Sequence, residues 1–172
     1  MIEKNNNEVV IGHLFKYPTE EIHLRELSRK THLSMPTIIS ITKKLEKEGL
    51  ISIKKGKALT VIKPNIEYKK FIRMKRIYNL NSLYLAGLVD FLVKEYNNPE
   101  AIICFGSYSK GEDFEKSDID IAIINGREKD IALEKFEKIL ARKISIHYIN
   151  LDKISKELKA NIINGIILEG AI

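Results

Sequence analysis

The sequence has little cysteine and no long apolar run, and both absences restrict its class. Its 172 residues include one cysteine, Cys104, which excludes an internal disulfide and favours a reducing, cytoplasmic setting. Its apolar runs are too short to span a membrane, and residues 1–10 lack the pattern of a signal peptide, so we expect no membrane association. No internal repeat or low-complexity segment is present. The apolar fraction of 44% suffices for a packed core, and the length suits two small domains.

Charge is distributed unevenly between the two halves of the chain. The net charge is +6, but residues 1–80 hold 17 Lys and Arg against 8 Asp and Glu, whereas residues 81–172 hold 12 against 15. A basic half joined to a mildly acidic half predicts two modules with different partners, and a polyanion is the expected partner of the first.

The first 65 residues have the pattern of three helices followed by a β-hairpin. Apolar residues at helical spacing predict helices within residues 5–18, 19–33 and 34–49. Ser34 is the expected N-cap of the third helix, and Gly49 is expected to end it. The alternating stretch 50–64 predicts two strands with Lys55 and Gly56 at the turn.

This order of elements, with "LRELSRKTHLSMPTIISITKKLEKEGLI" and the hairpin "KKGKA", resembles the winged helix-turn-helix domains of prokaryotic transcription regulators. The resemblance covers residues 5–65 and implies that residues 1–66 form a DNA-binding domain, which in such regulators usually belongs to a homodimer. A helix fits the major groove, so Thr37 and Ser40 are the candidates for base contacts. Phosphate contacts are expected from the exposed lysines, namely Lys43, Lys44, Lys47, Lys54, Lys55 and Lys57. Two alternatives stay open: the lysines solvate a helix surface, or the domain binds another protein.

The remainder of the chain predicts connecting helices over residues 67–96 and a small α/β domain over residues 97–172. The two connecting helices are expected to divide near Asn79–Asn81. Strands are predicted within residues 101–106, 118–124 and 143–151, with a helix over 130–141 between the last two. The chain is expected to end in a helix and a short apolar tail over residues 158–172.

The stretch "FGSYSKGEDFEKSDIDIAII" contains the residues with the clearest chemistry. Side chains two apart in a strand share a face, so Asp118 and Asp120 are expected to lie together while Ile119, Ile121 and Ile123 enter the core. Neighbouring carboxylates repel, and a divalent cation such as Mg²⁺ removes that conflict. The Gly106–Ser107 turn follows a strand and is suited to receive a phosphate. The alternative is that the acids cap the start of the strand together with Ser117.

The pattern of Gly106–Ser107, Gly111 and Ser117–Asp120 resembles the nucleotidyltransferase superfamily related to DNA polymerase beta, and most closely its minimal members. The resemblance covers roughly residues 80–172 and implies an α+β chain whose second domain has a mixed sheet. It further implies that Gly106 and Ser107 hold the phosphates of a nucleoside triphosphate, and that Lys110 adds a contact or is simply solvated. Asp118 and Asp120 would bind catalytic Mg²⁺ or Mn²⁺. Minimal nucleotidyltransferases often work with an all-helical partner protein, so such a partner is also implied.

The sequence departs from that family at one position. Active members carry a third carboxylate in a "VDLV"-like run, but the equivalent run here is "IHYI", which places His147 there, and Asp152 comes too late to substitute. His147 could act as the base, a single cation could suffice, or the site could bind nucleotide without turnover. The leading hypothesis is therefore a metal-dependent nucleotidyltransferase, transferring a nucleoside monophosphate to a hydroxyl, tethered to a DNA-binding domain. The alternative is a weakly active or inactive nucleotide-sensing transcription regulator or antitoxin-like protein.

Overall fold

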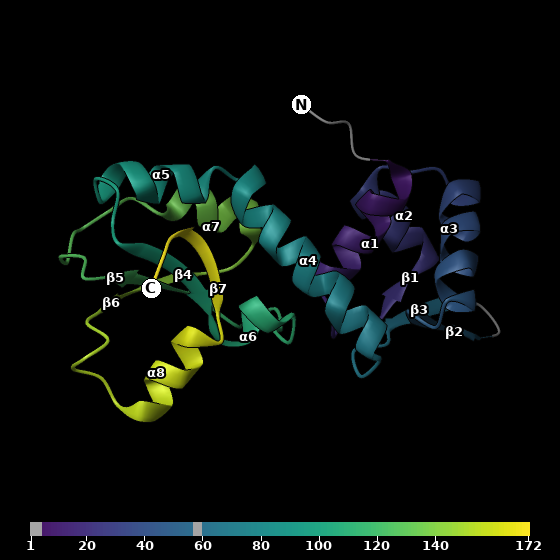
Figure 1. Ribbon diagram of the computed structural model, residues 1–172. Helices are drawn as coiled ribbons and strands as arrows, with labels where there is room; N and C mark the ends of the chain where they lie inside the picture. Colours follow the sequence, from purple (N-terminus) through teal and green to yellow (C-terminus); the bar gives the residue numbers. More distant parts are fainter. Residues whose placement is uncertain (1–4, 57–59) are drawn as a thin grey trace. The chain divides into compact units, whose positions relative to one another are not determined.

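The computed structural model describes residues 5–56 and 60–172 and has the predicted α+β composition (Figure 1). The chain divides into two compact units, Met1–Ile72 and Arg73–Ile172. The division falls inside one helix, α4 (Lys69–Leu85), so each unit is described by itself.

Unit 1 contains the three predicted helices, α1 (Asn6–Lys16), α2 (Leu24–Thr31) and α3 (Met35–Lys47). Ser34 is the N-cap of α3, because its side chain accepts a hydrogen bond from the Thr37 backbone N–H at 3.4 Å. Gly49, with φ of +74°, follows the helix end as expected, since glycine adopts this conformation without strain. Each of the three helices buries one apolar stripe. The buried residues of these stripes are Val10, Leu14, Phe15, Leu27, Ile38, Ile41 and Leu45.

The predicted hairpin is part of a three-stranded antiparallel sheet. Strands β2 (Ile51–Lys55) and β3 (Thr60–Pro64) pair with Ile53 opposite Ile62. A two-residue strand, β1 (Ile22–His23), adds to the other edge of β3, giving the order β1-β3-β2. β1 was not predicted, because two residues are too few to form a recognisable alternation. Lys57, another lysine predicted to contact phosphates, lies outside the described residues.

The predicted division of the connecting helices near Asn79–Asn81 is wrong. Helix α4 continues to Leu85, and the chain turns at Gly87, whose φ is +71°, before α5 (Leu88–Glu95). Asn79 does not interrupt α4, because it is only 3% exposed and its side-chain amide donates to groups on another segment. The pattern of turn-forming residues therefore misled the prediction at this point.

Unit 2 is built on a mixed sheet, as predicted, but the sheet has four strands and not the three expected. Its strands are β4 (Ala101–Phe105), β5 (Ile119–Ile124), β6 (Ile144–Ile149) and β7 (Ile166–Gly170), in the order β6-β5-β4-β7. β5 and β6 are parallel, and the other pairs are antiparallel. The tail that we expected after the last helix is in fact β7, an edge strand paired with β4.

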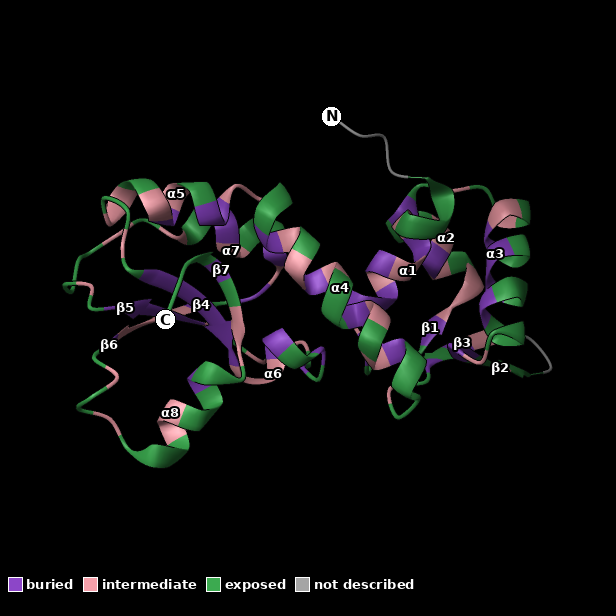
Figure 2. Ribbon diagram, in the orientation of Figure 1, coloured by how far each residue is buried: buried purple, intermediate pink, exposed green. Residues whose placement is uncertain are grey.

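Helices cover both faces of this sheet, and the strands β4 and β5 are largely buried (Figure 2). Ile119, Ile121 and Ile123 are fully buried on the face that also packs residues of α5 and of α7 (Glu134–Leu140), which confirms their predicted place in the core. The other face packs Ala122 and Ile124 with Ile162 of α8 (Lys156–Ile163). The helix expected from residue 130 begins only at Glu134. No helix among the described residues combines the length and apolarity needed to cross a membrane.

Candidate active site

A tight glycine turn joins β4 to the short helix α6 (Gly106–Lys110) beside the second acidic residue. Phe105, at the end of β4, is opposite Asp120 in the sheet, and Gly106 follows it with φ of +71°. A Cβ atom on Gly106 would lie 2.7 Å from Asp120 Oδ2. Residue 106 is therefore glycine for two reasons: its backbone conformation is strained for other residues, and the Asp120 carboxylate occupies the space of a side chain.

The two predicted acids lie at the start of β5, beside that turn. Asp118 immediately precedes the strand and is exposed, whereas the Asp120 side chain is 31% exposed. Ser145 of β6 is opposite Asp120 in the sheet, and its hydroxyl donates to Asp118 Oδ2 at 3.2 Å. Neighbouring residues on paired strands share a face, so the Ser145 side chain lies on the same face as Asp120. Because its hydroxyl also contacts Asp118, both carboxylates lie on that face.

Strand β6 places two non-acidic side chains on this face. His147 is opposite Ala122, and its Nε2 lies 3.0 Å from Asp120 Oδ1. The imidazole packs edge-on against the ring of Phe105, with centroids 5.1 Å apart. Our sequence reading singled out His147 and overlooked Ser145, which is directly opposite Asp120. The missed signal was the strand period, since residues 145 and 147 must share a face.

The donors of this site suit one hard cation better than two. Carboxylate and hydroxyl oxygens are the ligand type that Mg²⁺ prefers, and Mg²⁺ commonly shares its remaining positions with substrate phosphates and water. Within residues 5–56 and 60–172, however, no three or more His, Cys, Asp or Glu side chains are grouped so as to hold a metal ion. Asp118 and Asp120 therefore supply oxygens of the preferred type but fewer protein ligands than such an ion needs.

A third acid, Asp113, is buried behind the site and was missed by the sequence reading. It is 2% exposed, and Lys75 donates to both its backbone oxygen, at 2.6 Å, and its Oδ1. Asn79 Nδ2 donates to the same Oδ1 at 2.7 Å, and Arg142 Nη2 donates to Oδ2 at 3.2 Å. We call these four residues the Asp113 network. Burial lowers the pKa of the Lys75 ammonium below its ordinary value, and the neighbouring Asp113 carboxylate opposes that effect.

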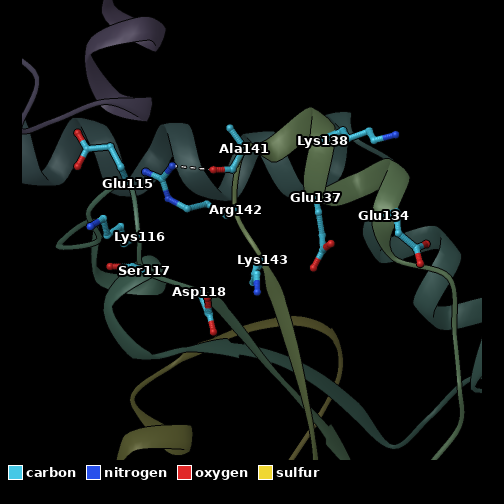
Figure 3. A pocket seen from close by; sticks show the side chains of 10 residues that line it. All are labelled: Glu115, Lys116, Ser117, Asp118, Glu134, Glu137, Lys138, Ala141, Arg142 and Lys143. Atoms are coloured by element: carbon cyan, nitrogen blue, oxygen red, sulfur yellow. Dashed lines mark hydrogen bonds between the residues drawn. The ribbon is translucent and has the colours of Figure 1, made fainter.

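A pocket of about 630 Å³ adjoins Asp118 on the side of α7 (Figure 3). Its walls come from the loop before β5, from α7 and from the turn between α7 and β6. Figure 3 shows Asp118 and Lys143 near its centre, whereas the Lys138 side chain points away. The pocket leaves Asp118 accessible to a ligand.

The other predicted residues lie apart from the acidic pair or in unit 1. Lys110 is exposed at the last position of α6. Thr37 is half-buried at the start of α3, and its hydroxyl hydrogen-bonds to Ser34 Oγ at 2.8 Å. The remaining candidates for DNA contact are all exposed, on α3 and on β2: Ser40, Lys43, Lys44, Lys47, Lys54 and Lys55.

Comparison with known families finds one similarity, within unit 2. The sequence model of the family described as polymerase beta, nucleotidyltransferase, matches residues 89–170. The match runs from α5 through β7 and includes the glycine turn, both acids and β6. This part of the chain is therefore similar to that family. Comparisons with curated proteins and with solved structures gave no match.

Proposed function

We propose that unit 2 is a metal-dependent nucleotidyltransferase that moves a nucleoside monophosphate from a triphosphate to a hydroxyl acceptor. The observation that supports this most strongly is the packing of the Asp120 carboxylate against Gly106, with Asp118 on the same face, inside the segment that matches the family. The glycine turn and the carboxylates are thus close enough to act on the same ligand.

We place the terminal phosphates of the nucleotide at Gly106 and Ser107. A glycine at this turn lets an anion approach the backbone N–H groups closely, and the half-buried Ser107 hydroxyl adds a donor. Lys110 follows within the same helix and would contribute a mobile positive charge to the phosphates. Asp118 and Asp120 would hold the cation; when bound, it neutralises charge on the phosphates and on the departing pyrophosphate.

In this reaction the acceptor oxygen attacks the α-phosphorus, the bond from the α-phosphorus to the bridging oxygen of the β-phosphate breaks, and pyrophosphate leaves. The hydroxyl proton must pass to a base. His147 is the candidate base, because donation from its Nε2 to Asp120 leaves the lone pair on Nδ1 to accept a proton. Ser145, a neutral hydroxyl, cannot take that role at neutral pH.

Incubation with each labelled nucleoside triphosphate, Mg²⁺ or Mn²⁺, and a panel of protein, small-molecule and nucleic-acid acceptors tests the proposal. Label transfer that depends on both the cation and Asp118 supports it. Absence of transfer to every acceptor, in a protein that still binds metal and nucleotide, would reject catalysis.

The second candidate is a nucleotide-sensing regulator with little or no turnover. It is favoured by one observation: the two β6 residues that face the acidic pair, Ser145 and His147, are not carboxylates. Calorimetry with nucleotide and metal, in the presence and absence of DNA, separates the two candidates. Nucleotide binding that changes DNA affinity without product formation favours the regulator.

We further propose that unit 1 is a winged helix-turn-helix domain that binds duplex DNA through α3 and β2. Support comes from the three helices and the hairpin, and from the exposed Lys43, Lys44, Lys54 and Lys55. Fluorescence anisotropy with a labelled duplex should give a salt slope that falls by about 1 for each phosphate-contacting lysine replaced by glutamine. The matched control is Lys153→Gln, an exposed lysine of unit 2. Equal salt slopes for all variants would contradict DNA binding by this surface.

A homodimer is proposed through α4. Its residues Ile77 and Leu85 are 69% and 62% exposed, and they are eight positions apart, on one side of the helix. Light scattering during size-exclusion chromatography should report a dimer that Ile77→Glu with Leu85→Glu converts to a monomer. An all-helical partner protein is the other proposed occupant of this surface, and a wild-type monomer in solution would favour it.

A further inference from the structure

The Asp113 network joins every part of the candidate active site. Asp113 belongs to the loop between α6 and β5, five residues before Asp118. Asn79 donates both to its carboxylate and, at 2.9 Å, to the backbone oxygen of Tyr108 in α6, the helix that begins at Gly106. Arg142 lies just before β6, the strand that carries Ser145 and His147. One carboxylate thus connects the glycine turn, the acidic loop and β6.

Burying the charged groups of this network costs more free energy than packing apolar residues in the same place would. The Lys75 and Asp113 side chains are each 1% exposed, and the Arg142 side chain is 2% exposed. Charged groups at such depth are costly unless every one is paired, and apolar residues of similar volume are often at least as stabilising. What the charged network adds is directional geometry: three donor side chains, two from α4 and one from the segment before β6, fix one carboxylate and therefore the loop that carries it.

We propose that Lys75, Asn79 and Arg142 are positioning residues that act through Asp113, and that they set the separation between the Gly106–Ser107 turn and Asp118. The proposal rests on the proposed function of unit 2 and adds residues that touch neither metal nor nucleotide. Arg142 and Asp118 both line the pocket, and the Arg142 guanidinium donates to the Ala141 carbonyl at 2.9 Å (Figure 3).

A loosened network should affect the metal site more than the phosphate site. Gly106 and Ser107 follow directly from β4, which is fixed on both sides by β5 and β7, so the turn keeps its place. Asp118 precedes β5 and depends on the loop that Asp113 holds. We therefore expect a higher Mg²⁺ requirement and a lower kcat, with little change in KM for the nucleotide.

The test compares Lys75→Met and Asn79→Ala with Arg76→Met, which removes an exposed cation from the next position of α4. The first readout is amide hydrogen exchange in the full chain, which requires no activity. Residues 111–118 should exchange about tenfold faster in Lys75→Met and Asn79→Ala, the factor expected when one hydrogen bond to a charged group is lost. Amides of β4 and β5 should keep their rates, and Arg76→Met should match the wild type.

The second readout is the Mg²⁺ concentration that gives half-maximal transfer, which a purely structural role would not change. It should rise about tenfold in both network variants, as expected for a loss of supporting contacts around a metal site, and Mn²⁺ should restore part of the rate. Unchanged exchange in residues 111–118, or an unchanged Mg²⁺ requirement in an active protein, would overturn the proposal. If Lys75→Met does not fold, the Asn79→Ala variant alone tests the proposal, because it removes a neutral group and leaves the buried charges paired. If the wild type transfers no nucleotide, the proposed function fails, and hydrogen exchange still decides whether the network holds the loop.

Discussion

Two groups of carboxylates in unit 2 illustrate different uses of the same side chain. Asp113 is buried and receives donors from three residues, so the protein itself satisfies it. Asp118 and Asp120 are at least partly exposed, and each has one side-chain hydrogen bond, to Ser145 and His147 respectively. In the proposed account, the buried acid maintains geometry, whereas the exposed acids keep oxygen lone pairs for a ligand.

The contrast explains why neighbouring like charges persist at the start of β5. Asp118 and Asp120 repel each other in the free protein. Such an arrangement lowers stability and is typical of sites that a ligand completes. The Asp113 network, by contrast, is complete without a ligand. Neutralising the exposed pair should therefore leave stability unchanged or raise it, whereas neutralising Asp113 should lower stability.

The largest expected effect is the loss of activity on neutralising the exposed pair. Asp118→Asn with Asp120→Asn should lower the transfer rate by roughly 10³-fold or more, since removing even one electrostatic stabiliser costs about 10²–10³. The free energy of unfolding, measured with urea, should stay the same or rise because a repulsion is removed. Asp152→Asn, an exposed acid outside the site, is the control. Retained activity in the double variant would place the chemistry elsewhere.

Neutralising the buried acid should reduce stability instead. Asp113→Asn leaves Lys75 and Arg142 facing an amide, and removal of one partner from a buried charged group costs about 3–5 kcal/mol. Urea unfolding should report this loss, while Asp130→Asn, an exposed acid, should change the free energy of unfolding by less than about 0.5 kcal/mol. Equal effects of the two substitutions would mean that the network contributes no stability.

Substitution of two glycines distinguishes the effect of backbone strain from the effect of contact with Asp120. Gly106 and Gly87 both have φ of +71°, but a Cβ on Gly87 meets nothing within 4 Å, whereas one on Gly106 meets Asp120. Gly87→Ala should cost about 1–2 kcal/mol of stability from strain alone. Gly106→Ala should cost at least as much and should also raise the dissociation constant for metal and nucleotide. If both variants bind nucleotide equally well, the close approach at Gly106 has no functional role.

The smallest effect concerns the only thiol, on β4 beside the acidic strand. Burial raises the pKa of Cys104 from 9.0 to about 12, and the Asp120 carboxylate adds to the rise. The unfolded chain loses this proton first, so the thiol stabilises the fold below pH 9 and that contribution is lost as pH rises toward 12. A thiol-reactive disulfide reagent at pH 8 should label native protein slowly and unfolded protein fully. Rapid labelling of the native protein would contradict the burial of β4.

Much of unit 2 was predictable because its signals are local. Short apolar stretches predicted β4, β5 and β6. The spacing of Asp118 and Asp120 predicted a shared face, which the hydrogen bond from Ser145 supports. β7 was missed because a short apolar stretch near the chain end gives no sign of which strand it pairs with.

The Asp113 network was missed because it depends on pairing across 29 to 38 positions. A signal nonetheless existed in α4, where Phe71, Lys75, Asn79 and Leu83 recur every fourth position and all are buried. A lysine and an asparagine within an apolar helical stripe require buried partners. The asparagine was instead taken as a helix breaker, although its amide has acceptors on the neighbouring segment. Only the tertiary structure identifies Asp113 as the acceptor.

Calorimetric titration with non-hydrolysable analogues of the four nucleoside triphosphates, with and without Mg²⁺, tests the central claim most directly. The account predicts that at least one analogue binds the wild type more tightly with Mg²⁺, and that Asp118→Asn with Asp120→Asn abolishes the gain while metal-free binding at Gly106 and Ser107 persists. The same Mg²⁺-dependent gain in wild type and double variant would show that these acids do not hold the cation.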